Sequence, residues 1–342
     1  MTTSAPSVSV QIRIDHYSAV HLAAAAARRT ALEHGLPGAL PDRAAVVASE
    51  LAGNLANHAQ DGSVYIQPLP LHAGVEILAV DRGPGMADPE LCLTDGFTTT
   101  GTMGSGLGAV RRIATELSVR TKPGIGTLIS ARLTAPSAGT GAERRVRSFG
   151  ALCLPAEGEE ECGDAWGLAE TDGDRTAAVI DGLGHGPPAA EAAQAALRAF
   201  HRDPGKPLAN VMAAMNRSLR RTRGAAVGLL RQRDGETEFC SVGNVRAHFV
   251  TPDGVRSRFG GQPGVVGLNM PLPRTERLAT DRDATLVVHS DGINSRWSHD
   301  PSPFLLRLPP PLLAGALAHG HRRVRDDATV LALGPTVTKR DR

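Results

Sequence analysis

The pattern of apolar and polar positions in the first 133 residues predicts helices followed by a sheet. Tyr17–His34 is typical of a helix that Gly35 can end, and Pro41-Asp42 opens a second helix that runs to about Ala59. A glycine-rich segment leads into a third helix at about Leu107–Leu117. The expected strands are Val64–Gln67, Val75–Val80, Ser118–Thr121 and Thr127–Arg132. Helices packed on such a sheet form an α+β layer.

Downstream of this region the pattern changes to hairpins. Trp166–Glu170 and Thr176–Ile180 are separated by the turn Thr171–Asp174, and Asp-Gly pairs mark further turns. Helical segments are expected near Ala189–His201 and Leu208–Arg220. The mixture predicts a sheet-rich core that is covered by helices.

The length of 342 residues exceeds what one hydrophobic core usually supports, so two domains are expected. Thr134–Glu143 is rich in small residues and proline, and it lies between two segments of alternating apolar pattern, as a linker would. We therefore expect an N-terminal domain at 1–133, a linker at 134–145, a C-terminal domain at 146–336 and a tail at 337–342.

Composition argues against several classes of function. The formal net charge is +2, with Lys and Arg scattered among Asp and Glu, so no nucleic-acid or membrane surface is predicted. The first residues lack a basic segment followed by an apolar core, and no apolar run reaches the ~20 residues of a membrane helix. The cysteines form no CxxC pair, which favours a reducing cytoplasm and no zinc site; they are Cys92, Cys153, Cys162 and Cys240.

Glu50, Asn54 and His58 follow one another at four-residue intervals in the second predicted helix, so they share one face. Apolar residues line another face of this helix: Val47, Leu51 and Leu55. A carboxamide oxygen suits Mg²⁺, and a carboxylate beside it can take a proton from an attacking group. Taken alone, the spacing is better explained by a polar helix face in water.

Asp81 ends an apolar predicted strand and is followed by Arg82-Gly83-Pro84-Gly85. Glycine lets the backbone approach a flat ring, and a buried carboxylate can accept an amino hydrogen, so Asp81 would select adenine. Gly96–Gly108 then places further glycines directly before a helix, where free backbone N–H groups favour phosphates. A flexible loop is the commoner explanation of glycines alone, but the order of all these parts is a far stronger signal.

This order resembles the GHKL ATP-binding superfamily over about residues 10–133, and it is most similar to the small bacterial serine kinases of partner-switching systems, which include RsbT. Asp95–Gly101 carries the likeness to RsbT especially. The resemblance implies a Bergerat-type α/β sandwich that binds ATP and Mg²⁺, with Glu50 as catalytic base, Asn54 as Mg²⁺ ligand and Asp81 as adenine contact. The implied nucleotide-loop positions are Gly83, Gly85, Gly104, Gly106 and Gly108.

Four carboxylates stand at the ends of predicted strands in the second half of the chain. Asp164 and Asp181 belong to the two strands of one hairpin, whereas Asp291 follows one apolar strand and Asp326 precedes another. Such carboxylates can enclose two hard cations, and the carbonyl group of Gly182 can add a neutral ligand.

Asp-Gly is also a frequent turn pair, so most such pairs in this chain are expected only to turn it. Asp181-Gly182 and Asp291-Gly292 differ because an apolar strand precedes each. His185 can contact substrate or organise water, but a hydrogen bond that stabilises its loop explains it at least as well. We therefore do not assign His185 a catalytic role.

The second order of residues resembles the metal-dependent (PPM) Ser/Thr protein phosphatases over about residues 146–335, in the bacterial branch of SpoIIE and RsbX. The resemblance implies a β-sandwich flanked by helices, and attack on phosphoserine or phosphothreonine by a metal-bound hydroxide. The implied ligands of two Mn²⁺ or Mg²⁺ ions are Asp164, Asp181, Gly182, Asp291 and Asp326. Asp327 would lie behind them or substitute for one, and Gly243-Asn244 matches a structural turn of the family.

Together the two resemblances imply a bifunctional partner-switching regulator in sigma-factor or stress signalling. Its kinase and phosphatase domains would act on an STAS-domain anti-sigma antagonist or a stressosome protein, with a sigma factor as a further candidate partner. The chief alternative is a phosphatase whose N-terminal domain only binds nucleotide and sequesters such a partner. A structural protein without metal dependence is the third. Kinases of this type often pair as homodimers, which these residues do not decide.

Overall fold

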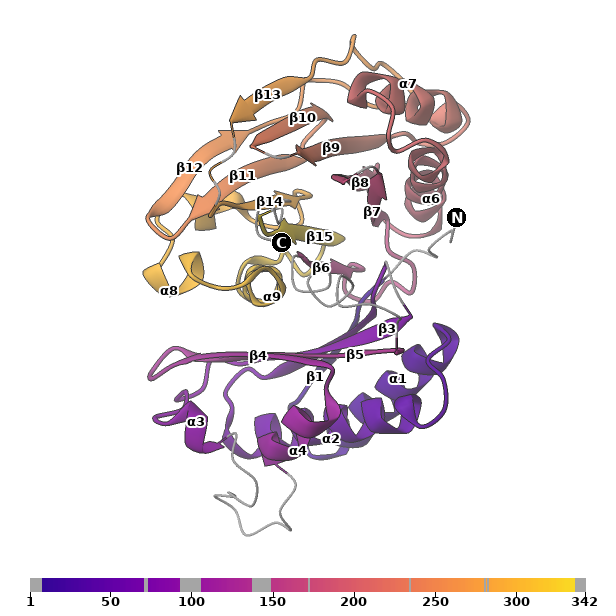
Figure 1. Cartoon of the computed structure of the whole chain (residues 1–342). Coiled ribbons are helices and arrows are strands. Elements are labelled where there is room, and N and C mark those ends of the chain that lie inside the picture. Colours follow the sequence, from indigo (N-terminus) through magenta and orange to yellow (C-terminus); the bar gives the residue numbers. More distant parts are fainter. Residues whose placement is uncertain are drawn as a thin grey trace. The chain divides into compact units, whose positions relative to one another are not determined.

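The computed structural model describes residues 8–70, 73–92, 106–136, 149–171, 173–233, 235–279, 281 and 283–335. The chain divides into two compact units, the first Ser9–Arg144 and the second built on Arg145–Arg342. Each unit has its own sheets and its own buried hydrophobic residues (Figure 1).

The first unit contains one antiparallel sheet in the order β1-β2-β3-β5-β4, and the helices α1, α2 and α4 lie together on one of its faces (Figure 1). The elements are β1 Val10–Arg13, α1 Ser18–Glu33, α2 Leu40–His58, β2 Ser63–Pro68, β3 Gly74–Val80, α3 Pro89–Cys92, α4 Gly106–Ile113, β4 Glu116–Lys122 and β5 Gly126–Thr134. Most buried positions of α1 are alanine, so α1 can lie close to α2 while losing little side-chain entropy.

The α+β layer predicted from the sequence is confirmed, with one helix predicted too long and two short elements, β1 and α3, not predicted. The third helix ends at Ile113 instead of Leu117, because the chain from Glu116 onward pairs with β5 and alternates in the manner of a strand. Strand β1 was not predicted, and it pairs with β2 at the edge of the sheet. Thr134 is the last residue of β5, and residues 137–148 lie outside the described ranges, so the linker stays a prediction.

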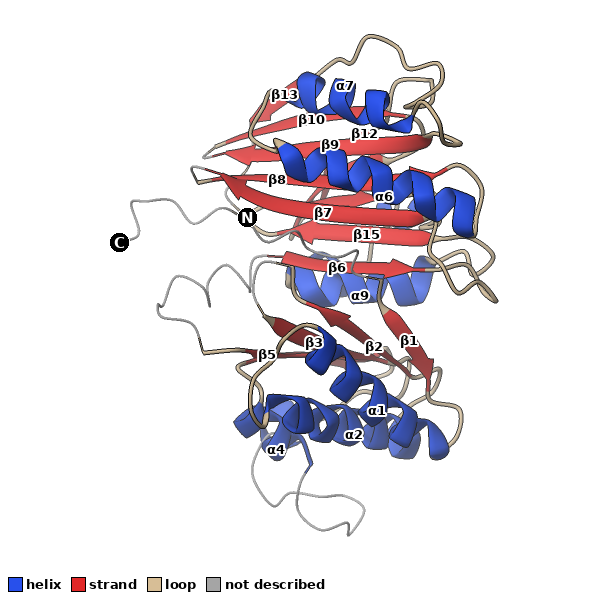
Figure 2. Ribbon diagram, turned by 90° about the vertical axis from the view of Figure 1, so that its right-hand side faces the viewer, coloured by secondary structure: helices blue, strands red, loops and turns tan. Residues whose placement is uncertain are grey.

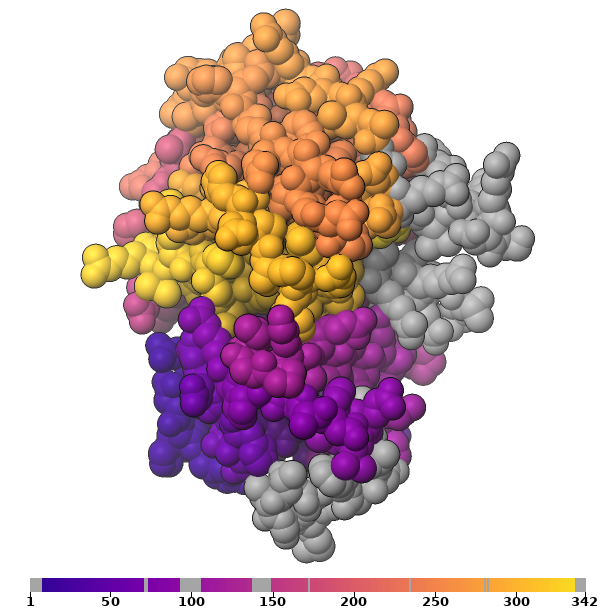
Figure 3. Space-filling model, turned by 90° about the vertical axis from the view of Figure 1, so that its left-hand side faces the viewer, coloured from indigo at the N-terminus to yellow at the C-terminus, as the bar shows by residue number. Residues whose placement is uncertain are grey.

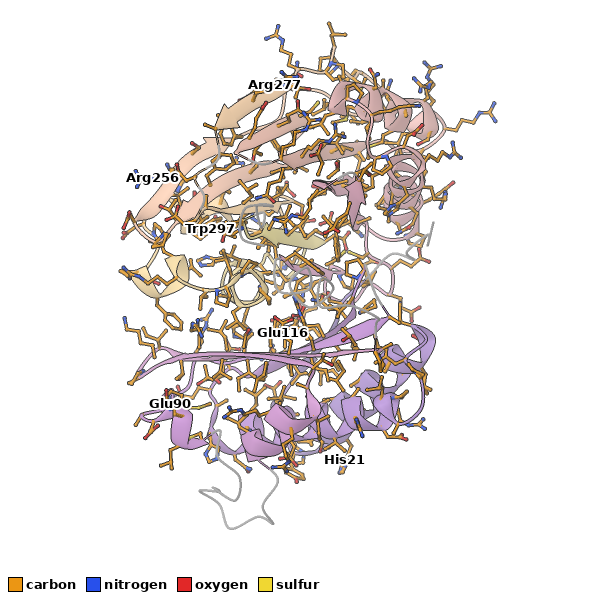
Figure 4. All side chains as sticks on the ribbon, viewed as in Figure 1. His21, Glu90, Glu116, Arg256, Arg277 and Trp297 are labelled. Carbon is orange, nitrogen blue, oxygen red and sulfur yellow. The ribbon has the colours of Figure 1, made fainter. Side chains whose placement is uncertain are left out.

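A buried network of polar side chains joins four strands of this sheet. Arg132 Nε donates to Glu76 Oε1 at 2.7 Å, and the two side chains are 1% and 2% exposed. Gln67 Nε2 and Ser130 Oγ each donate to the Glu76 carboxylate at 2.7 Å. Glu116, labelled in Figure 4, places its Oε2 at 3.8 Å from Arg132 Nη1. A buried charge is tolerated only with such partners, so the network depends on each of its members.

The second unit consists of two five-stranded sheets packed face to face, in the orders β13-β10-β9-β8-β7 and β12-β11-β14-β15-β6. Helices α6 and α7 cover the first sheet, and α9 packs on β6 and β15 of the second (Figures 1 and 2). Figure 3 shows the face opposite to that of Figure 2, where residues of β11, β12 and the C-terminal segments, in orange and yellow, form the surface. The β-sandwich flanked by helices that the resemblance implied is thus confirmed.

The strands of the second unit are β6 Phe149–Leu154, β7 Asp164–Thr171, β8 Asp174–Gly182, β9 Ala225–Arg233, β10 Glu236–Val242, β11 Arg246–Thr251, β12 Gly254–Phe259, β13 Glu276–Ala279, β14 Thr285–His289 and β15 Ala328–Leu333. Its helices are α6 Pro187–Arg202, α7 Leu208–Leu219, the 3₁₀ helix η1 Ser295–Ser298, α8 Pro303–Leu306 and α9 Pro310–His321. Helix α9 was not predicted, because it is buried on most sides and therefore shows no polar face in the sequence.

Two absences hold for the described ranges. None of their helices combines the length and the apolar character needed to cross a membrane. None of the four cysteines forms a disulfide, although Cys153 Sγ and Cys162 Sγ lie 3.5 Å apart in the core of the second unit.

Glu76→Ala should lower the free energy of unfolding of the first unit by ~3–5 kcal/mol, because Arg132 would stay buried without its main anion. Urea unfolding followed by circular dichroism measures this loss. Trp166 and Trp297 are the two tryptophans of the chain, and both lie in the second unit, so fluorescence follows that unit separately.

The matched control is Asp42→Ala, which removes an ion pair with Arg28 on the surface of the same unit. These two side chains are 68% and 53% exposed, so the change should cost only about 0–1 kcal/mol. Equal losses of unfolding free energy in the two variants would contradict the larger contribution proposed for the buried pair.

Candidate functional sites

Helix α2 presents its polar residues on the face that does not pack. Glu50 and Asn54 are half-buried and His58 is exposed, whereas Val47 and Leu51 are fully buried between the helices and the sheet. Residues one helical turn apart lie above one another, so Glu50 and Asn54 share one face as the spacing predicts. Their roles as base and Mg²⁺ ligand stay predictions.

Asp81 is held by the backbone directly after β3. Its Oδ1 accepts the N–H of Gly83 at 2.7 Å and the N–H of Thr127 at 3.3 Å. Burial raises the pKa of Asp81, and the two amide hydrogen bonds oppose that rise. Its Oδ2 accepts no hydrogen bond within the described residues. This oxygen can therefore accept a hydrogen from the amino group of a ligand.

The glycines around Asp81 are required by close backbone packing. Gly85 has a φ of 73°, and a Cβ there would lie 2.5 Å from the carbonyl oxygen of Lys122. Gly126 has a φ of 133°, and its Cβ would lie 2.1 Å from the carbonyl oxygen of Asp81. The sequence assigned Gly83 and Gly85 to the nucleotide, and it placed Gly126 only in a turn between the last two predicted strands. In the structure these glycines let the β4–β5 turn reach Asp81.

The glycine-rich segment before α4 is described only from its end. Gly106 is the first residue of α4, with a φ of 39°, and Gly108 is buried in the first turn. Gly104 and the RsbT-like segment Asp95–Gly101 lie outside the described residues. Their assignment to the phosphates stays a prediction.

The predicted hairpin of the second unit is β7 and β8, and its register places Asp164 directly opposite Asp181. The N–H of Gly182 donates to the carbonyl oxygen of Gly163 at 2.9 Å. A Cβ at Gly182 would lie 2.3 Å from the carbonyl oxygen of Ala189 in α6. Glycine after Asp181 is thus required because α6 begins so close to the strand.

Asp181 lies near three other carboxylates. Its Oδ2 is buried and has no hydrogen-bond partner. Burial raises the pKa of Asp181 well above its usual value, and Asp164, Asp291 and Asp326 raise it further. The pKa of Asp326 is raised by burial and then by Asp291 and Asp327. Carboxylates raise one another's pKa only when they lie close together, so the fold brings all four predicted carboxylates to one end of the sandwich.

Asp164 is bound by protein donors, unlike Asp181. Its Oδ2 accepts the hydroxyl of Ser290 at 2.6 Å, and Ser290 Oγ in turn accepts the N–H of Thr329 at 2.9 Å. Asp164 is 1% exposed, and burial raises its pKa well above the usual value, with Cys153 adding to the rise. Ser290 thereby joins the end of β14 to β7 and β15.

Two further side chains support the cluster. Asn244 Nδ2 donates to Asp291 Oδ2 at 2.8 Å. Asp327 Oδ1 accepts the N–H of Ala156 at 2.9 Å, while its Oδ2 is buried without a partner. Sequence reasoning treated Asn244 only as part of a turn, and its place directly after Gly243 was the available signal. In the structure Asn244 orients Asp291.

His185 contacts Glu159 instead of the carboxylate cluster. His185 Nδ1 lies 2.7 Å from Glu159 Oε1, and the His185 side chain is 68% exposed. This contact ties the loop after Asp181 to the segment before β7. It agrees with the interpretation that His185 stabilises its loop.

The chemistry of the cluster suits divalent cations. Within the described ranges, no group of three or more His, Cys, Asp or Glu side chains converges closely enough to hold a metal ion in this structure. The same carboxylates are nevertheless close enough to raise one another's pKa, and Asp181 Oδ2 lacks any partner. Anionic oxygens are the ligands that Mg²⁺ and Mn²⁺ prefer, and a cation would remove the repulsion. These carboxylates therefore fit a divalent cation, although their side chains must move closer together to coordinate it.

A buried pair of histidines lies directly before the Ser290-Asp291 segment. His248 Nε2 and His289 Nε2 are 3.1 Å apart, and Trp297, labelled in Figure 4, packs on His248 at 4.9 Å between ring centroids. His289 Nδ1 lies 2.8 Å from the carbonyl oxygen of Ser290, which can only accept, so His289 donates there and His248 donates to His289. Burial lowers the pKa to about 3 for His248 and to about 4 for His289. Both imidazoles are therefore neutral at pH 7.

Two protein-family models match the chain. One, described as "Histidine kinase-like ATPase domain", matches residues 15–133. The other, described as "Stage II sporulation protein E (SpoIIE)", matches residues 171–335. The two matches fall in the first and the second unit respectively.

Individual proteins are also similar to the chain. The serine/threonine-protein kinase RsbT of Bacillus subtilis (strain 168) is 36% identical over 106 residues, which are 30% of this chain and 80% of RsbT. A solved structure described as "The bacterial stressosome: a modular system that has been adapted to control secondary messenger signaling" is 30% identical and covers 54% of this chain and 97% of that chain, at a TM-score of 0.50. The crystal structure of RsbX with magnesium is 21% identical and covers 65% of this chain and 100% of that chain, at a TM-score of 0.47.

The histidine pair predicts how the stability of the second unit depends on pH. Both folded pKa values lie below the ordinary 6.5, so the unfolded chain takes up protons first as the pH falls. Stability should be full above about pH 6.5 and fall below it, by up to ~1.4 kcal/mol per pH unit for each histidine. Urea unfolding followed by tryptophan fluorescence between about pH 7 and pH 5 measures the slope. His248→Gln should make the dependence of stability on pH shallower. An unchanged slope would show that the histidine pair does not cause it.

Proposed function

The chain belongs to the histidine kinase-like ATPases through its N-terminal unit and to the SpoIIE family through its C-terminal unit, and we propose that it is a bifunctional partner-switching regulator. In this proposal the RsbT-like domain phosphorylates a Ser or Thr of an STAS-domain antagonist or a stressosome protein. The PP2C-type domain hydrolyses the phosphate ester of such a residue. The observation that carries the proposal is the cluster of carboxylates around Asp181, whose repulsion a divalent metal centre would relieve.

In the kinase domain, the residues of α2 and Asp81 would have different roles. Glu50 would take the proton of the attacking hydroxyl group, and the side-chain oxygen of Asn54 would hold Mg²⁺. Bound ATP supplies the phosphoryl group. Asp81 Oδ2 would accept the adenine amino hydrogen, since Oδ1 is occupied by backbone N–H groups. The backbone N–H groups of the glycines before and within α4, Gly104, Gly106 and Gly108, would bind the phosphates.

In the phosphatase domain, two Mn²⁺ or Mg²⁺ ions held by Asp164, Asp181, the Gly182 carbonyl group, Asp291 and Asp326 would supply the activated water for hydrolysis. The protein orients two of these ligands through hydrogen bonds from other side chains. Asn244 sets the direction of Asp291, and Ser290 sets that of Asp164. Serine or threonine and inorganic phosphate are the products.

The two activities oppose each other. If both acted on one residue of one partner, the sum would be hydrolysis of ATP to ADP and phosphate. We therefore infer that nucleotide, the state of the partner or contact between the domains favours one activity at a time. In the alternative function, the first unit binds nucleotide and captures an STAS protein or a sigma factor without transferring phosphate.

Glu50→Ala should abolish transfer of ³²P from labelled ATP to an STAS-domain protein, by roughly 10²- to 10⁴-fold, because the attacking hydroxyl loses its base. It should leave release of label from the phosphorylated partner unchanged. Asp181→Asn should do the reverse, because the metal centre loses an anionic ligand that the cluster cannot replace.

Matched controls are Glu33→Ala, an exposed carboxylate at the end of α1, and Asp253→Asn, an exposed Asp-Gly turn residue with a side chain 77% exposed. Neither control should change either rate. If neither Glu50→Ala nor Asp181→Asn changes either activity, the site assignments are wrong. Partner binding that persists in Glu50→Ala, together with no phosphate transfer by the natural chain, would favour the alternative function.

Asp81→Asn should weaken ATP binding by roughly 10- to 100-fold, because the amide can keep its oxygen on the backbone donors but then turns NH₂ toward the adenine amino group. The same NH₂ group suits the keto oxygen of guanine, so the preference for ATP over GTP should narrow. Calorimetric titration with each nucleotide and Mg²⁺ measures both effects, with Asp42→Asn as a surface control. An unchanged ratio of the ATP and GTP affinities would show that Asp81 does not contact the base.

A further inference from the structure

The turn between α7 and β9 runs beside the loop that starts at Asp181. Gly182 pairs with Ala225 at the start of β9, and the N–H of Leu183 donates to the carbonyl oxygen of Gly224 at 3.1 Å. Arg223 is the residue directly before Gly224. The strand register therefore places Arg223 at the same end of the sheet as Asp181.

The guanidinium group of Arg223 lies over Gly184 of that loop. A Cβ at Gly184 would lie 2.9 Å from Arg223 Nη1, and Gly184 has a φ of 88°. Both facts favour glycine at this position, and the absence of a side chain leaves the room in which the guanidinium group lies. Among the described residues, no atom of the neighbouring Arg221 lies within 4 Å of a Cβ at Gly184.

Arg223 has no anionic partner in the part of the chain that the structure describes. It is exposed, and none of the ion pairs or hydrogen bonds of these residues includes it. A surface arginine usually lies loose in water, but Arg223 is packed against the loop of the carboxylate cluster without neutralising any of its members. Its five N–H donors therefore remain available for a ligand.

The chemistry of a guanidinium group at this place selects a phosphate group. Its planar fork binds two oxygens of a phosphate at once, and it stays charged at every relevant pH. The carboxylates at the same end of the sheet suit cations and the guanidinium group suits an anion, so a metal-bound phosphate would satisfy both. Resting on the proposed phosphatase function, we propose that Arg223 binds the phosphoryl group of the substrate and the inorganic phosphate product.

Arg223→Ala should raise KM for p-nitrophenyl phosphate, and the inhibition constant of inorganic phosphate, by roughly 10- to 100-fold, because a charge-assisted pair of hydrogen bonds is lost. The affinity for Mn²⁺, measured by calorimetry, should change less than about twofold, because Arg223 is not a metal ligand. Arg223→Lys should restore part of the phosphate affinity, since it keeps the charge but loses the fork. Arg221→Ala, in the same turn, is the matched control and should behave as the natural chain.

KM and phosphate inhibition in Arg223→Ala that stay within about twofold of Arg221→Ala would overturn the proposal. If the natural chain hydrolyses no phosphate ester, the proposed function fails, and equilibrium dialysis with ³²P-orthophosphate and Mg²⁺ decides the role of Arg223 separately. Binding lost in Arg223→Ala but kept in Arg221→Ala supports the proposal. Equal binding in the two variants, or none in the natural chain, overturns it. Tryptophan fluorescence melting confirms that each variant is folded.

Discussion

The pairing of β7 with β8 places Asp164 opposite Asp181, and this constraint organises the carboxylate end of the second unit. Two carboxylates buried side by side are stable only with donors, protons or cations to balance them. The fold gives Asp164 the hydroxyl of Ser290 and leaves Asp181 Oδ2 without a protein partner. The first carboxylate is thereby oriented, and the second is left to a ligand. A divalent cation between the strand ends is the simplest partner with the right charge.

Glycine makes this crowding of carboxylates possible. A Cβ at Gly292 would lie 1.9 Å from the carbonyl oxygen of Asp327, and one at Gly163 would lie 2.5 Å from Asp327 Oδ2. Strand ends and the start of α6 therefore approach more closely than any larger residue would allow. The residues of Asp181-Gly182 and Asp291-Gly292 thus have two separate roles: the aspartate belongs to the cluster, and the glycine allows the close packing around it.

The first unit treats its key carboxylate in another way. Asp81 is held at Oδ1 by two backbone N–H groups, so one oxygen is fixed and the other is directed to a ligand. No second carboxylate is among the causes of its raised pKa, which suits recognition of a neutral base better than binding of paired cations. The two units therefore use aspartates at strand ends for different tasks, and this difference is what the proposed kinase and phosphatase activities require.

The sequence by itself determined the order of the elements and the carboxylates at their ends, because an apolar strand before Asp81, Asp181 or Asp291 is a local signal. It overextended one helix and missed α9, whose polar face is absent because tertiary packing covers it. Only the tertiary structure decided that Ser290 bonds to Asp164, 126 positions away, that Asn244 bonds to Asp291, 47 positions away, and that Arg223 lies over Gly184. Periodicity tells which side of an element is buried, whereas strand register and sheet packing choose which residue lies opposite.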